Sequence, residues 1–140
     1  MNLVYKKLLT PLLDQEKVKK NFDAFKASKP STQIVYDSNV LCGTFVQTQK
    51  DTLNVFECKF SEYIYARSQN LNIFSLGGFA CILTKEGKML VIRRGKNLLY
   101  YPNYLSLVGG HLAFNSHVSQ SVRGDAIFKM TNEEVKEELG

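Results

Sequence analysis

Four glutamates crowd the end of this sequence, because Glu133, Glu134, Glu137 and Glu138 fill four of six successive positions. In a helix, Glu134, Glu137 and Glu138 stand at i, i+3 and i+4 and therefore share one face. Like charges at this spacing repel, and the negative end of the helix dipole also disfavours carboxylates in a last turn. A divalent cation such as Mg²⁺, held by carboxylate oxygens, would offset both costs. The run therefore predicts a metal site, with a solvated acidic surface as the alternative.

The elements that must position these glutamates are predicted from residue 76 onward. Apolar runs and turn residues predict a buried hairpin, a tyrosine-rich loop, a short strand that enters a glycine pair, and a final helix. In chain order these are strand 78–84, turn 85–88, strand 89–94, the loop with Tyr100, Tyr101 and Tyr104, strand 105–108, Gly109-Gly110, and helix 126–139 with Gly140 as its C-cap.

The first half of the chain predicts a small α+β region. Helical periodicity places a helix over 14–27 with Asp14 as N-cap, and a second helix over 61–68 with Ser61 as N-cap. Short strands are predicted at 34–36, 43–46 and 53–60, the last two joined as a hairpin around residues 49–51.

The second half of the chain resembles the Nudix hydrolases, whose box reads G-x5-E-x7-R-E-U-x-E-E-x-G-U, with U an aliphatic residue. Residues 134–140 (E-V-K-E-E-L-G) match the E-U-x-E-E-x-G core at each defined position. Asp125 precedes Glu134 by nine residues, the separation the family keeps between its first two glutamates. Gly109-Gly110 is similar to the glycine pair that opens the box.

The sequence departs from the family pattern in several places. Glu133 stands where the family has an arginine, and Asp125 replaces a glutamate. Fourteen residues separate Gly110 from Asp125, so 113–123 read as an inserted surface loop. The box ends at Gly140, and the remaining strands and second helix of a Nudix fold do not follow. The expectation is a truncated Nudix domain.

The resemblance implies hydrolysis of the diphosphate bond in a nucleoside diphosphate linked to another moiety, with Mg²⁺ or Mn²⁺ as cofactor. It implies Glu134, Glu137 and Glu138 as metal ligands, with Glu134 and Glu137 catalytic, and Asp125 as a supporting ligand. A non-catalytic nucleotide- or protein-binding relative, or an inactive fragment, is the alternative reading.

Substrate-binding residues are expected around the same box. Gly109 and Gly110 would let the loop approach the helix closely. Arg93 and Arg94 are candidates for phosphate contact, although adjacent strand residues face opposite sides, so at most one points into the site. Tyr101 and its neighbours could stack a nucleobase or simply pack in the loop. His111 could assist the site or act as a turn residue, and His117 reads as solvated.

Composition sets the broader class. The chain has 140 residues, 44% of them hydrophobic, and a net charge of +5, without the basic runs or motifs that predict nucleic-acid binding. It contains no apolar run of transmembrane length and no secretory signal pattern, so a cytoplasmic protein is expected. Cys42, Cys58 and Cys81 are predicted to be buried thiols in a reducing compartment.

The predicted fold class is α+β: a Nudix-like α/β/α sandwich with a mixed sheet over 73–140, preceded by a small α+β region over 1–72. An unfinished sheet would expose an edge that invites pairing, so a homodimer is one expected assembly. The leaving group of the substrate is not predicted by any residue in the chain.

Overall fold

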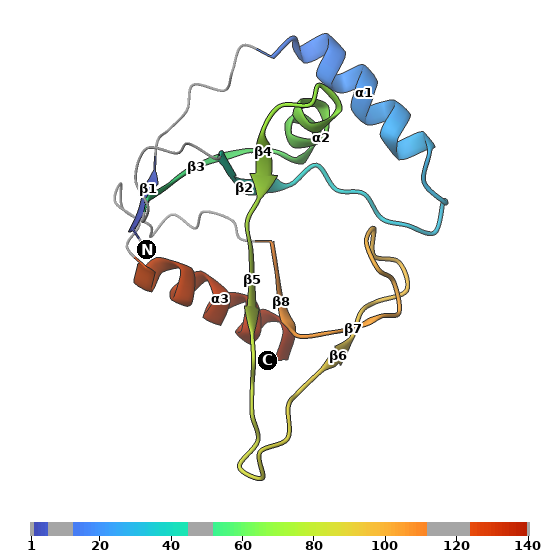
Figure 1. Cartoon of the computed structure of the whole chain (residues 1–140). Coiled ribbons are helices and arrows are strands. Elements are labelled where there is room, and N and C mark those ends of the chain that lie inside the picture. Colours follow the sequence, from blue (N-terminus) through green and yellow to red (C-terminus); the bar gives the residue numbers. More distant parts are fainter. Residues whose placement is uncertain (1, 6–12, 45–51, 112–123, 140) are drawn as a thin grey trace.

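The protein has a mixed α+β fold with small open sheets, as the sequence predicts at the level of class. The computed structural model describes residues 2–5, 13–44, 52–111 and 124–139, and at some of these, including 125, 134 and 138, only the backbone. In Figure 1 a four-stranded sheet lies beside two helices, and a continuous segment leads from it to two small strand pairs and a third helix.

Helix α1 (Gln15–Ala27) forms where the periodicity predicts it. The Asp14 carboxylate is its N-cap and accepts hydrogen bonds from the backbone N–H groups of Glu16 and Lys17 at 3.1 and 3.2 Å. Val18 and Phe22 are its buried residues. The predicted helix and its cap are both confirmed.

The four-stranded sheet has the order β1-β3-β2-β4, from β1 (Asn2–Tyr5), β2 (Asn39–Thr44), β3 (Thr52–Lys59) and β4 (Ile73–Ser75). β1 pairs with β3 in parallel, whereas β2 pairs with β3 and β4 antiparallel, so the sheet is mixed. The predicted pairing of the second and third strands is confirmed, and the residues predicted as its turn lie outside the described part of the chain.

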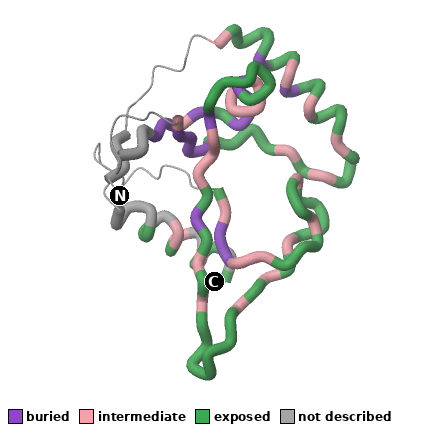
Figure 2. The backbone as a smooth tube through the Cα atoms, in the orientation of Figure 1, coloured by how far each residue is buried: buried purple, intermediate pink, exposed green. Residues whose placement is uncertain are grey.

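The main core lies between this sheet and the helices α1 and α2 (Phe60–Ser68). Phe22 of α1 and Phe60 of α2 meet edge to face with their ring centroids 6.2 Å apart. Leu41 and Val55 lie at the alternate positions of β2 and β3, so their side chains face the side of the sheet opposite to this core. Both are fully buried. Figure 2 shows the buried residues concentrated in this half of the molecule.

The second half is built from strand pairs rather than one sheet. β5 (Gly77–Ala80) pairs antiparallel with β8 (Val108–His111), and β6 (Ile92–Arg93) pairs antiparallel with β7 (Leu105–Ser106). Helix α3 (Gly124–Leu139) packs against β5 and β8, and Val108 of β8 is fully buried. The predicted final helix is confirmed, beginning two residues earlier than expected. No helix in the described part of the chain is long and apolar enough to cross a membrane.

The predicted hairpin over 78–94 is only partly formed. The turn is confirmed, since the Thr84 N–H donates to the Lys88 carbonyl at 2.8 Å and Gly87 has φ +76°. Beyond it, Leu83 makes only an isolated bridge with Met89. Both side chains are exposed. The prediction of a buried strand here was wrong, because no described layer covers these residues.

Three smaller predictions are also corrected. Residues 34–36 form no strand; the Ile34 N–H instead donates to the Asn97 carbonyl of a distant loop at 3.1 Å. Ser61 is not the N-cap of α2 but a buried residue in its first turn, and Lys59 is the cap. Cys81 is exposed, whereas Cys42 and Cys58 are buried as predicted.

Candidate functional site

The acidic helix predicted to carry the metal ligands is α3, and its contacts with β8 bring it beside the strand that holds Gly109 and Gly110. Glu137 is exposed and Glu133 is half-buried. The side chains of Asp125, Glu134 and Glu138 lie outside the described part of the structure. Among the side chains that are described, no group of three or more acidic, histidine or cysteine residues could hold a metal. The metal site therefore remains a prediction.

Gly109 adopts a backbone conformation that favours glycine. Its φ is +136°, and a Cβ added there would lie 2.1 Å from the Gly78 carbonyl oxygen on the paired strand β5. The close approach at Gly109 is therefore between β8 and β5, whereas the prediction was that a loop would approach the helix. Gly110 follows in β8 and borders a cavity.

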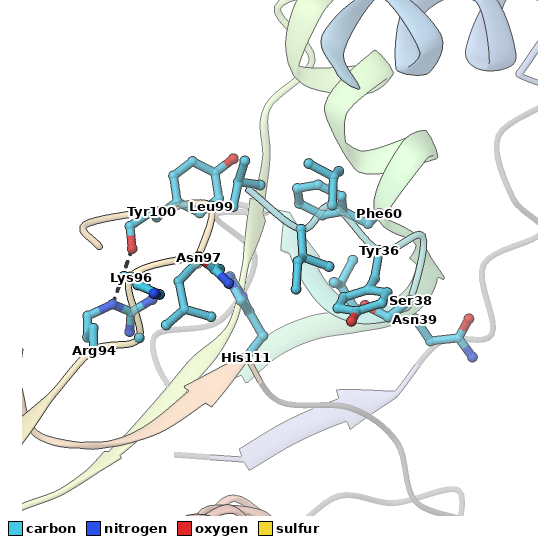
Figure 3. Close-up of a pocket in the computed structure, with 15 residues that line it drawn as sticks. Tyr36, Ser38, Asn39, Phe60, Arg94, Lys96, Asn97, Leu99, Tyr100 and His111 are labelled. Atoms are coloured by element: carbon cyan, nitrogen blue, oxygen red, sulfur yellow. Dashed lines mark hydrogen bonds between the residues drawn. The ribbon is translucent and has the colours of Figure 1, made fainter. Parts of the chain in front are cut away.

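The two arginines predicted to contact phosphate differ in their hydrogen-bond partners and in the cavities that they border. Arg93 lies in β6 and donates through Nη1 to the Asn103 carbonyl at 2.9 Å, and it borders neither of the cavities described here. Arg94 donates through Nε to the Tyr100 carbonyl at 3.2 Å and borders both cavities. The hydrogen bond from Arg94 is visible as a dashed line in Figure 3.

The tyrosine-rich loop presents its rings to the surface rather than to the core. Tyr101 has φ +50°, is 69% exposed, and meets Tyr104 edge to face with centroids 5.8 Å apart. Tyr100 is less exposed, and burial followed by the nearby Tyr63 raises its pKa. Two aromatic faces thus remain open to solvent beside the cavity that the loop borders.

The larger cavity, of about 780 Å³, gathers three of the predicted substrate-binding residues. Arg94, Tyr101 and Gly110 border it, whereas Arg93 and Gly109 do not. Helix α2 contributes Tyr63 and Arg67 to its wall. None of the described residues of α3, Glu137 among them, borders it.

A second cavity, of about 660 Å³, shares Arg94 and Tyr100 with the first. It is bordered by the extended segment 34–40, by the loop 94–100 and by His111 (Figure 3). Within this segment only residues 34–36 were predicted as a strand, and no motif in the sequence indicated that the segment would form a wall of a cavity.

His111 is one of four described residues that border both cavities, with Phe60, Arg94 and Tyr100. Although the His111 side chain is exposed on one side, partial desolvation by its neighbours, and secondarily the positive charge of Arg94, lower its pKa from the ordinary value of 6.5. The neutral imidazole is therefore favoured near pH 7, with one ring nitrogen able to accept and the other able to donate. In the sequence, the only indication that His111 would belong to the site was its position directly after Gly110.

The charge around the two cavities has one sign. Arg67, Arg94 and Lys96 border them, and no aspartate or glutamate does among the described residues. This arrangement suits an anionic small molecule.

The chain matches no family model, no curated protein and no solved structure at a significant level.

Proposed function

We propose that the protein is a metal-dependent pyrophosphohydrolase of the Nudix type, which cleaves the diphosphate bond of a nucleoside diphosphate linked to another moiety. The observation that carries the proposal is that residues 134–139 of the E-U-x-E-E-x-G pattern belong to a helix that packs against β8, the strand of Gly109 and Gly110. In this proposal residues 73–140 form the front part of a Nudix-like α/β/α sandwich.

Each part of the proposed site has a chemical role. Glu134, Glu137 and Glu138, with Asp125 in support, would hold Mg²⁺ or Mn²⁺, which neutralises phosphoryl oxygens and lowers the pKa of a bound water. Arg94 would contact the diphosphate, and the exposed ring of Tyr101 would stack on a nucleobase. The larger cavity, which both residues border, is the proposed place of the substrate.

The test is hydrolysis of a panel of nucleoside diphosphate derivatives during titration with Mg²⁺ or Mn²⁺. The Glu137→Gln variant removes one carboxylate oxygen from the proposed ligand set and should lower turnover by about a hundredfold or more. Glu86→Gln makes the same change in the exposed turn far from α3 and is the matched control. Metal-dependent hydrolysis that Glu137→Gln leaves intact would refute the assigned site.

A second candidate is a nucleotide-binding protein without hydrolysis. Two observations favour it: the cavities are bordered by Arg94, His111 and tyrosines, and by none of the described residues of α3. Glu133 in place of the family's arginine favours it too. Nucleotide binding without turnover at saturating metal would select this candidate.

A further inference from the structure

The smaller cavity combines an apolar wall with a polar end. Its apolar border comes from segment 34–40, from α2 and from the loop 94–100, through Ile34, Val35, Val40, Phe60, Leu98 and Leu99. In Figure 3, Arg94 and Lys96 lie at one side of this cavity and Tyr36 and Phe60 lie across from them. A volume of about 660 Å³ falls within the range of small-molecule sites, which bury an apolar body and fix it through a few polar groups.

The polar end carries positive charge that the protein does not neutralise. Arg94 and Lys96 border the cavity, and neither forms an ion pair with a carboxylate among the described residues. The Nε of Arg94 is used by the Tyr100 carbonyl, whereas its Nη groups donate to no described acceptor. These Nη groups and the Lys96 ammonium are therefore available to an anion.

His111 adds a third group at the same end of the cavity. It stands at the end of β8, and the charged and titratable groups that border the cavity with it are Arg94, Lys96, Tyr36 and Tyr100. None of these groups is a carboxylate, so His111 has no anionic partner there. An anion beside Arg94 would supply one and would favour the protonated imidazole.

We propose that this cavity is a binding site for an organic anion, in which an aromatic or aliphatic body lies against Phe60 and Leu98 and a phosphate group is held by Arg94 and Lys96. The site shares Arg94 with the larger cavity that is proposed for the diphosphate substrate, whereas Lys96 and Leu98 border only the smaller one. Binding here requires neither the metal nor hydrolysis, so the inference stands whether or not the protein is a pyrophosphohydrolase.

Phenyl phosphate is the probe, and inorganic phosphate and phenol are its two halves. Binding is measured by calorimetry in metal-free buffer with EDTA, and the His111 pKa by NMR in the wild type, with the His117→Gln variant to assign the two histidine signals. We expect phenyl phosphate to bind more tightly than either half and to raise the His111 pKa. Phenol should leave that pKa unchanged, since it brings no charge.

Two variants test the two ends of the site. Lys96→Gln should weaken phenyl phosphate by about tenfold, the size expected for one charge-assisted contact. Leu98→Asn should weaken phenyl phosphate but leave inorganic phosphate unchanged. Lys88→Gln removes the same charge from the exposed turn and should change neither. Lys96 and Leu98 border only the smaller cavity, so these losses would not arise from the proposed diphosphate site.

The proposal is overturned if phenyl phosphate fails to bind, if it binds equally well to Lys96→Gln and Lys88→Gln, or if it binds without raising the His111 pKa. Failure of hydrolysis with these results intact would refute the proposed enzyme and not this site.

Discussion

Gly109 shows how one residue can fix the geometry of a strand pair. Its φ of +136° strains any residue with a side chain, and an added Cβ would meet the Gly78 carbonyl oxygen at 2.1 Å. Gly109→Ala should therefore lower the free energy of unfolding by about 2–3 kcal/mol, because either β8 or β5 must shift. Urea unfolding of the two proteins measures the difference.

Gly87 provides the control for this prediction. It also has a positive φ, of +76°, but a Cβ there would meet nothing within 4 Å. Gly87→Ala should cost only about 1 kcal/mol, the price of the left-handed conformation alone. Equal losses in the two variants would show that the contact with Gly78 contributes nothing.

His111 gives the stability of the protein a pH dependence with a defined sign. Burial and the Arg94 charge lower its pKa in the folded chain below the ordinary 6.5. The unfolded chain therefore binds more protons between the lowered value and 6.5, and stability falls as the pH drops through that window. Urea unfolding between about pH 7 and pH 5 should show this loss, and His111→Gln should reduce it.

The comparison variant for His111 is Arg94→Gln. It removes the second cause of the shift and leaves the larger one, burial, so part of the pH dependence should remain. An unchanged pH dependence in His111→Gln would assign the effect to other groups.

The roles of single residues could be predicted where they depend only on residue type and on near neighbours in the sequence. Asp14 as a cap follows from residue type and position alone, and the structure confirms it. The convergence of Arg94 with His111 was not predicted, because it depends on how the loop 94–104 folds against β8. Cys81 was assigned to the core from its apolar neighbours, yet two of them, Phe79 and Leu83, are themselves exposed.

The first turn of helix α2 is stabilised by a distant residue as well as by the local contact between the Lys59 N–H and the Glu62 carboxylate. The Asp37 carboxylate accepts hydrogen bonds from the Ser61 N–H at 2.8 Å and from the Ser61 hydroxyl at 3.0 Å, across 24 residues of sequence. It thus satisfies a backbone donor in the first turn, as an N-cap side chain does. Asp37→Ala should therefore destabilise the protein by about 1–2 kcal/mol in urea unfolding.

The specificity of the Asp37 effect can be checked in two ways. Asp23→Ala removes an exposed carboxylate whose ion pair with Lys26 contributes little, so its cost should stay near or below about 0.5 kcal/mol. In a Ser61→Ala background, which lacks the hydroxyl, Asp37→Ala should cost less than in the wild type. Additive losses would mean that the two side chains do not act together.

At the scale of elements, the three helices and strand β3 were predictable because each follows its own periodicity and end signals. Residues 34–36 and 89–94 have the apolar composition of strands, but a strand also needs a partner along its length. The first segment meets a loop through Asn97, and the second pairs with β7 at Ile92 and Arg93 and otherwise makes one isolated bridge at Met89. Such pairing is decided by distant parts of the chain.

Buried residues are distributed unevenly between the two halves of the molecule. This distribution determines which half supports the walls of the proposed sites. The core around the four-stranded sheet buries residues from α1, α2, β2, β3 and β4. The second half exposes large apolar residues such as Phe79, Leu83 and Leu105. Phe60 belongs to the core and borders both cavities, so the better-packed half supports one wall of each.

The three cysteines differ in exposure in the same way as the two halves of the molecule. Cys42 and Cys58 lie in the sheet core with their Sγ atoms 3.5 Å apart, and the neighbouring Cys42 thiol together with burial raises the pKa of Cys58. Cys81 is exposed beyond the end of β5. A thiol reagent should therefore modify one cysteine per native chain rapidly and all three after denaturation. Cys81→Ser should abolish the rapid reaction, whereas rapid reaction of Cys42 or Cys58 would mean that the sheet core opens readily.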